Sequence, residues 1–69
     1  MKISNDKLYQ LCNKYQWFTC GSVKQYNLMF ELNKRGAELE KLATIIWICS
    51  TGYDEQFILE ILKKESDLQ

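Results

Sequence analysis

The 69-residue sequence contains no histidine and no proline, and it has only three glycines. Histidine is the most common general base in enzymes, so its absence disfavours acid–base and nucleophilic catalysis. The glycines, Gly21, Gly36 and Gly52, punctuate a chain in which nothing is typical of a linker, a low-complexity tract or an internal repeat. At this length, one domain that spans residues 1–69 is the expected organisation.

An excess of charge of one sign is also lacking, because nine basic and nine acidic residues cancel. Proteins that bind nucleic acid generally carry a basic excess, which neutralises phosphates, and proteins that mimic nucleic acid carry an acidic excess. The longest apolar run, from Ala43 to Cys49, is shorter than the ~18 to 20 residues of a membrane span. We therefore expect neither a nucleic-acid partner nor a membrane-spanning segment.

Cysteine is scarce and odd in number, with Cys12, Cys20 and Cys49 as its three positions. Nothing after Met1 has the apolar character of a secretory signal, so the sequence favours the reducing cytoplasm and free thiols. A structural zinc site needs four cysteine or histidine ligands, and these cysteine spacings match no zinc pattern. No metal and no cofactor are predicted.

Apolar residues recur at helical spacing along the whole chain, which predicts an all-α, compact four-helix domain. The first helix should begin after Ser4, which is a good N-cap, and end near Tyr15. The second should open at Ser22, where Gln25 completes a capping box, and stop at Gly36.

The third helix is expected from about Ala37 to Ser50, with Gly52 beyond its end. Its second half is apolar in every direction around the axis, through Ile45, Ile46, Trp47, Ile48 and Cys49. Such a helix must be covered on nearly all sides, either by the other helices or by a partner chain. We therefore predict a central third helix with Trp47 in the core, unless this helix is the seam of a homodimer.

The fourth helix takes Asp54 as its N-cap, and the tail after Glu65 is expected to fray. Glu60 and Lys64 have the spacing of an ion pair on the outer face of this helix. Four apolar side chains are expected to point inward: Phe57, Ile58, Ile61 and Leu62.

Catalysis has one weak candidate, the thiol of Cys20 close to the start of the second helix, where the helix dipole lowers a thiol pKa. Packing of this thiol under the loop of Trp17 and Phe18 is the simpler interpretation. Acidic pairs such as Asp54 and Glu55 lie in first turns, where capping explains them, and neighbouring positions do not share a helix face. The sequence therefore predicts a protein that is not an enzyme.

Aromatic residues make up 13% of the chain, more than so small a core can enclose. Tryptophan and tyrosine are the residue types most enriched at binding hot spots. The candidates for contacts with a partner are Trp17, Tyr53 and Tyr9. For Trp17 an alternative stays open, in which the side chain folds back over the second helix and closes the core; for Phe18 we favour this second arrangement.

The third and fourth helices also resemble the end of a helix-turn-helix unit, through Leu42, Ala43 and a short turn from Ser50 to Tyr53. Against this interpretation, Trp47 occupies a position near the turn where that family prefers a small residue. The would-be recognition helix opens with Asp54, Glu55 and Gln56, and carboxylates at that position repel DNA. A degenerate helix-turn-helix DNA-binding or transcriptional accessory protein is therefore the alternative function.

The segment from Phe18 to Ser50 reads FTCGSVKQYNLMFELNKRGAELEKLATIIWICS. Through its FTCG and QY-x-x-MFEL strings it resembles small uncharacterised helical proteins of phages and mobile elements of low-GC Gram-positive bacteria. The resemblance implies a stoichiometric binder of a host protein, and in its most specific form an anti-CRISPR inhibitor of a CRISPR nuclease. It transfers no functional residue. Our expectation is a small protein-binding module.

Overall fold

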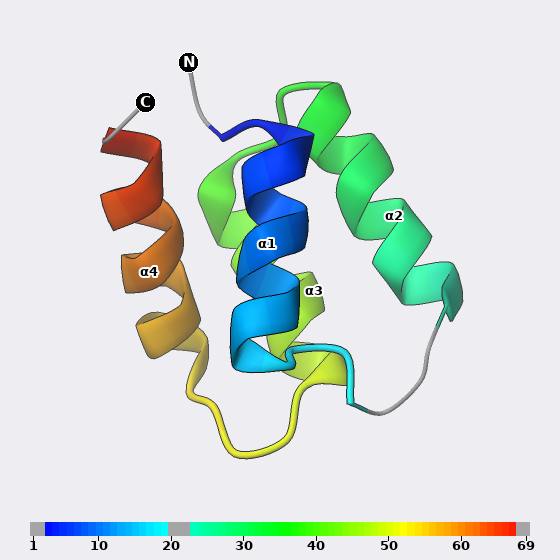
Figure 1. Cartoon of the computed structure of the whole chain (residues 1–69), viewed down its shortest axis with the longest axis vertical. Coiled ribbons are helices and arrows are strands. Elements are labelled where there is room, and N and C mark those ends of the chain that lie inside the picture. The colour runs from blue at the N-terminus through cyan, green and yellow to red at the C-terminus, as the bar shows by residue number, and fades with distance from the viewer. Residues whose placement is uncertain (1–2, 20–22, 68–69) are drawn as a thin grey trace.

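The computed structural model describes residues 3–19 and 23–67 and consists of four α-helices in that part of the chain (Figure 1). Their bounds are α1 (Asn5–Tyr15), α2 (Val23–Lys34), α3 (Leu39–Cys49) and α4 (Glu55–Asp67). The described residues contain no strand. The predicted all-α, four-helix domain is therefore confirmed.

The ends of α1 follow from local chemistry. Ser4 is the N-cap, as predicted, and its hydroxyl accepts a hydrogen bond of 3.1 Å from the backbone N–H of Lys7. At the other end Gln16 takes a left-handed conformation with φ of 53°, which few residues other than glycine adopt. The N–H of Trp17 then bonds to the Cys12 carbonyl at 3.1 Å. This turn reverses the chain directly after α1.

The connection between α2 and α3 is a glycine stop. Gly36 has φ of 84°, and the N–H of Ala37 donates a 2.9 Å hydrogen bond to the Leu32 carbonyl. Because the chain leaves this turn extended through Glu38, α3 begins at Leu39, two residues later than predicted. The predicted capping residue of α2, Ser22, lies outside the described residues.

The last helix, α4, starts at the predicted N-cap. It begins directly after Asp54, as predicted, and the Ile58 N–H donates to the Asp54 carbonyl at 3.1 Å. It continues to Asp67, and the predicted fraying of the tail after Glu65 stays a prediction. The Glu65 carboxylate forms a 3.4 Å ion pair with Lys7 of α1, which holds this last turn.

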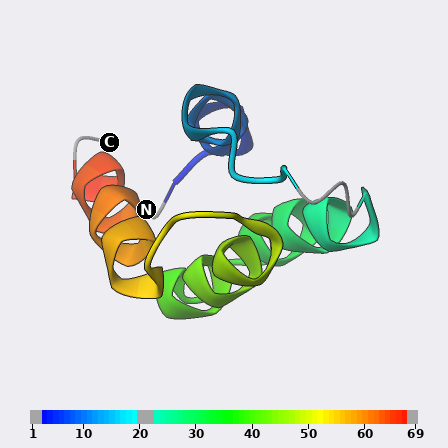
Figure 2. The same ribbon diagram turned by 90° about the horizontal axis from the view of Figure 1, so that it is seen from below.

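Helices α2, α3 and α4 form a curved layer, and α1 lies over one side of it (Figure 2). In this layer α3 lies in the middle and packs against both α2 and α4, while α1 covers the concave side. The predicted central position of α3 is therefore confirmed. Each helix adds side chains to one core, whose largest fully buried members are Trp17, Leu8, Met29, Leu42, Ile46, Ile58 and Leu62.

One buried polar side chain ties α1 to α2. Asn33, with 8% of its surface exposed, donates from Nδ2 to the Ile3 carbonyl at 3.0 Å and to Asn5 Oδ1 at 2.7 Å. Both acceptors lie at the start of α1. Because a buried amide must find partners, this pair of bonds sets the position of α1 over the layer.

Two predictions about buried aromatic residues are wrong. Trp47 is 45% exposed and Ile48 is 60% exposed, because α1 covers only the concave side of the layer and leaves the outer face of α3 open. Phe57 is 47% exposed, whereas Leu59 is buried. The inward stripe of α4 runs through Ile58, Leu59 and Leu62, and Phe57 lies beside it.

Candidate functional site

Trp17, a predicted partner contact, lies in the core. Its side chain is completely buried, and its ring stacks on Tyr15 with 5.3 Å between ring centroids. The Trp17 carbonyl accepts a 2.6 Å hydrogen bond from the Ser50 hydroxyl at the end of α3. The left-handed turn at Gln16 directs the chain inward at this point. Trp17 therefore closes the core, and its side chain is not accessible to a partner.

Tyr9 lies on the surface, with 51% of its area exposed. The centroid of its ring is 6.3 Å from that of Phe30 on α2. Tyr26 contacts Phe30 edge-to-face at 4.9 Å and contacts Phe18 in the same way at 4.7 Å, so the four rings form a row. This row bridges α1 and α2. Most of its rings are partly buried, which is the geometry of a helix–helix contact.

Beside this row lies a shallow groove of about 350 Å³ between α1 and α2. Seven residues line it: Cys12, Asn13, Gln16, Phe18, Thr19, Val23 and Tyr26. Burial raises the pKa of the Cys12 thiol to about 12, so the thiol is neutral at physiological pH and a poor nucleophile. Cys20, the predicted nucleophile candidate, lies outside the described residues.

Tyr53, the third candidate, lies in the connection between α3 and α4 and is partly buried. Its ring stacks on exposed Phe57 at 5.8 Å and contacts Tyr15 edge-on at 6.3 Å. A continuous row of rings therefore runs from buried Trp17 to the surface at Phe57. The structure places Tyr53 and Tyr9 in different aromatic rows, so the predicted candidates do not form one site.

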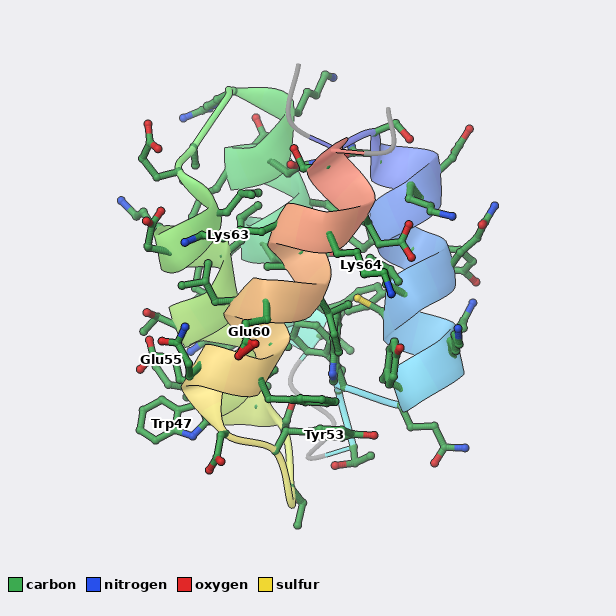
Figure 3. All side chains as sticks on the ribbon, turned by 90° about the vertical axis from the view of Figure 1, so that its left-hand side faces the viewer. Trp47, Tyr53, Glu55, Glu60, Lys63 and Lys64 are labelled. Atoms are coloured by element: carbon green, nitrogen blue, oxygen red, sulfur yellow. The ribbon has the colours of Figure 1, made fainter. Side chains whose placement is uncertain are left out.

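The residue that sequence reasoning missed is Trp47. It is exposed, as is Ile48, at the end of the outer face of α3. Figure 3 shows Trp47 and Tyr53 on opposite sides of the first turn of α4. A signal was present in the sequence, because Glu40, Lys41 and Thr44 mark the outer face of the helix, and the same face continues through Trp47 and Ile48. We name residues 47–57 the α3–α4 corner.

The α3–α4 corner carries carboxylates beside its exposed apolar residues. Thr44 Oγ1 donates a hydrogen bond to the Glu55 carboxylate, which therefore lies against the outer face of α3. Asp54 is exposed, and neither carboxylate forms an ion pair within the described part of the chain. No basic residue occupies the last turn of α3, where the helix dipole is negative. The charged side chains of the α3–α4 corner itself are therefore all acidic, and the nearby cation of α1, Lys14, lies over the Tyr15 ring, 5.4 Å from its centroid.

The predicted ion pair between Glu60 and Lys64 does not form. Figure 3 shows the two side chains pointing away from each other, Lys64 toward α1. The ion pairs found between described residues instead link Lys7 with Glu65 and, at 3.2 Å, Arg35 with Glu31. Glu60 therefore forms no ion pair with another residue that the structure describes.

Metal-binding groups and membrane-spanning helices are both absent from the described residues. These residues contain no group of three or more cysteine, aspartate and glutamate side chains placed to hold a metal ion. No helix among them combines the length and the apolar character needed to cross a lipid bilayer. Comparison of the whole chain with protein-family models, curated proteins and solved structures found no match. The observations that bear on function are therefore those of the surface itself.

Proposed function

We propose that this chain is a non-enzymatic binding module that acts stoichiometrically on another protein through the α3–α4 corner. The observation that carries the proposal is the exposed pair Trp47 and Ile48 on the outer face of the central helix. Tryptophan at a protein surface is the residue type with the strongest enrichment at interface hot spots. Tyr53 and Phe57 extend the aromatic surface around the first turn of α4.

The thiol chemistry of the described residues supports binding over catalysis. Cys12 and Cys49 are both buried, and the Cys12 thiol has a raised pKa. With no histidine in the chain, neither thiol has the usual base that would activate it. A stoichiometric binder needs no such group, because its effect follows from the surface it covers.

The resemblance to phage and mobile-element proteins supplies the identity of the partner in this proposal. The partner is a host protein, and the most specific form of the proposal is a CRISPR nuclease that the chain inhibits. The competing use of the same face is a homodimer, in which Trp47 and Ile48 of two copies contact each other.

Capture of host proteins by the immobilised chain tests the proposal, with binding stoichiometry then measured by calorimetry on the purified partner. Trp47→Ala should weaken binding about 30-fold, which corresponds to the ~2 kcal/mol of a hot spot. Tyr9→Ala is the matched control, because it removes an aromatic side chain of similar exposure, 51% against 45%, from α1. Unchanged binding by Trp47→Ala, together with a loss in Tyr9→Ala, would move the site to the α1–α2 row.

Sedimentation of the isolated chain separates the proposal from the homodimer. A monomer at micromolar concentration is expected. A dimer that Trp47→Ala converts to a monomer would show that the α3–α4 corner serves self-association.

A further inference from the structure

We propose that the α3–α4 corner recognises a basic segment of the partner protein, with an arginine side chain lying over Trp47 and against Glu55. This inference rests on the proposed function, since it names the chemistry of the partner at the same surface.

Basic and acidic residues are separated along part of the chain. No lysine or arginine occurs from Leu42 to Leu62, whereas Asp54, Glu55 and Glu60 all lie in that stretch. The nearest basic residues in sequence are Lys41 and Lys63, and Figure 3 shows Lys63 well away from Trp47 along α4. All charged residues in the stretch that contains Trp47 are therefore acidic, and acidic side chains beside an exposed tryptophan favour a basic partner.

Glu55 of α4 lies against the face of α3 that carries Trp47. The carboxylate accepts the hydrogen bond of Thr44, which lies three residues before Trp47 on the same face of α3. In Figure 3 both Glu55 and Trp47 lie on the α3 side of α4. An indole face attracts a cation, and a neighbouring carboxylate accepts hydrogen bonds from a guanidinium. Arginine matches both groups better than lysine, because its planar head stacks and donates at the same time.

The C-terminal end of α3 also favours a cation. Its last turn contains Trp47 and Ile48 but no basic residue, so the negative end of the helix dipole has no cationic side chain of that turn beside it, and Ser50 donates to its last carbonyls. A cationic group of the partner would supply that charge, and Ile48 offers apolar surface to its methylene stem. Phosphate-bearing ligands such as DNA or an anionic membrane are disfavoured by the same charges.

Nuclear magnetic resonance of the ¹⁵N-labelled chain provides a direct test. The two tryptophans give two indole N–H signals, one from buried Trp17 and one from exposed Trp47. The probe is a short peptide with two arginines and one leucine, and the control peptide has glutamates in place of the arginines. The Trp47 signal should move with the arginine peptide alone, the Trp17 signal should stay, and added salt should weaken binding. Equal shifts with both peptides, or no shift with either, would overturn the proposal.

Charge-neutralising variants locate the effect. Glu55→Gln keeps the size of the side chain and should weaken binding of the arginine peptide about tenfold. Glu31→Gln is the matched control, because it removes the same charge from the exposed surface of α2, and its effect should stay within about twofold. An equal loss of peptide affinity in both variants would show that only the net charge of the chain matters, and it would contradict the proposed contact.

Failure of this inference is distinguishable from failure of the proposed function. Full capture of the partner by Glu55→Gln, combined with loss in Trp47→Ala, would leave the binding module in place and refute the basic segment. Normal capture by Trp47→Ala would refute both.

Discussion

The two tryptophans should respond in opposite ways to truncation, because one closes the core and the other lies on the surface. Trp17 has no exposed area, and a buried tryptophan replaced by alanine costs about 3 to 5 kcal/mol. A domain of this length has a total stability of roughly 3 to 10 kcal/mol. Trp17→Ala should therefore lower the melting temperature by roughly 12 to 40 °C, or unfold the chain outright.

A conservative variant separates volume from hydrogen bonding at the same position. The indole Nε1 of Trp17 is buried and has no hydrogen-bond partner among the described residues. Trp17→Phe keeps the stack on Tyr15 and removes that N–H, whose desolvation costs about 1 to 3 kcal/mol. Its loss of stability should be less than half that of Trp17→Ala.

Urea denaturation followed by far-ultraviolet circular dichroism measures these differences. Trp47→Ala is the comparison, and it should cost about 1 kcal/mol or less because the side chain is 45% exposed. A midpoint for Trp17→Ala equal to that of the natural chain would refute the buried assignment. A larger loss in Trp47→Ala than in Trp17→Ala would show that α3 is covered on its outer face.

Three further predictions concern polar groups. Asn33→Ala should cost about 1 to 3 kcal/mol in urea denaturation, because it leaves the buried Ile3 carbonyl without its donor, while Asn27→Ala on the exposed side of α2 should be nearly neutral. The free energy of unfolding should fall by about 1.4 kcal/mol per pH unit between pH ~9 and pH ~12. In that range the Cys12 thiol of the unfolded chain loses its proton, whereas burial keeps the thiol of the folded chain protonated. Cys12→Ala should flatten this dependence, and an unchanged slope would contradict its cause. In gel-shift titration, mixed duplex DNA should show no salt-sensitive binding, whereas tight binding that added salt weakens would restore the helix-turn-helix alternative.

Local chemistry in the sequence was sufficient to predict where most helices start and stop. Ser4 caps α1 because its hydroxyl reaches a nearby backbone N–H, and Gly36 ends α2 because it tolerates a left-handed conformation. Both effects involve residues within one turn of each other. The ion pair between Lys7 and Glu65 was not predictable in this way, because the two residues lie near opposite ends of the chain.

Which aromatic residues are exposed was decided by the tertiary structure alone. Helical spacing tells which residues share a face, but it does not tell which face another helix covers. In α3 the polar residues before Thr44 indicated the open side, yet the apolar run that followed allowed full burial equally well. Because α1 lies only on the concave side of the layer, Trp47 was left in solvent, and because the chain turns inward after Gln16, Trp17 was placed in the core.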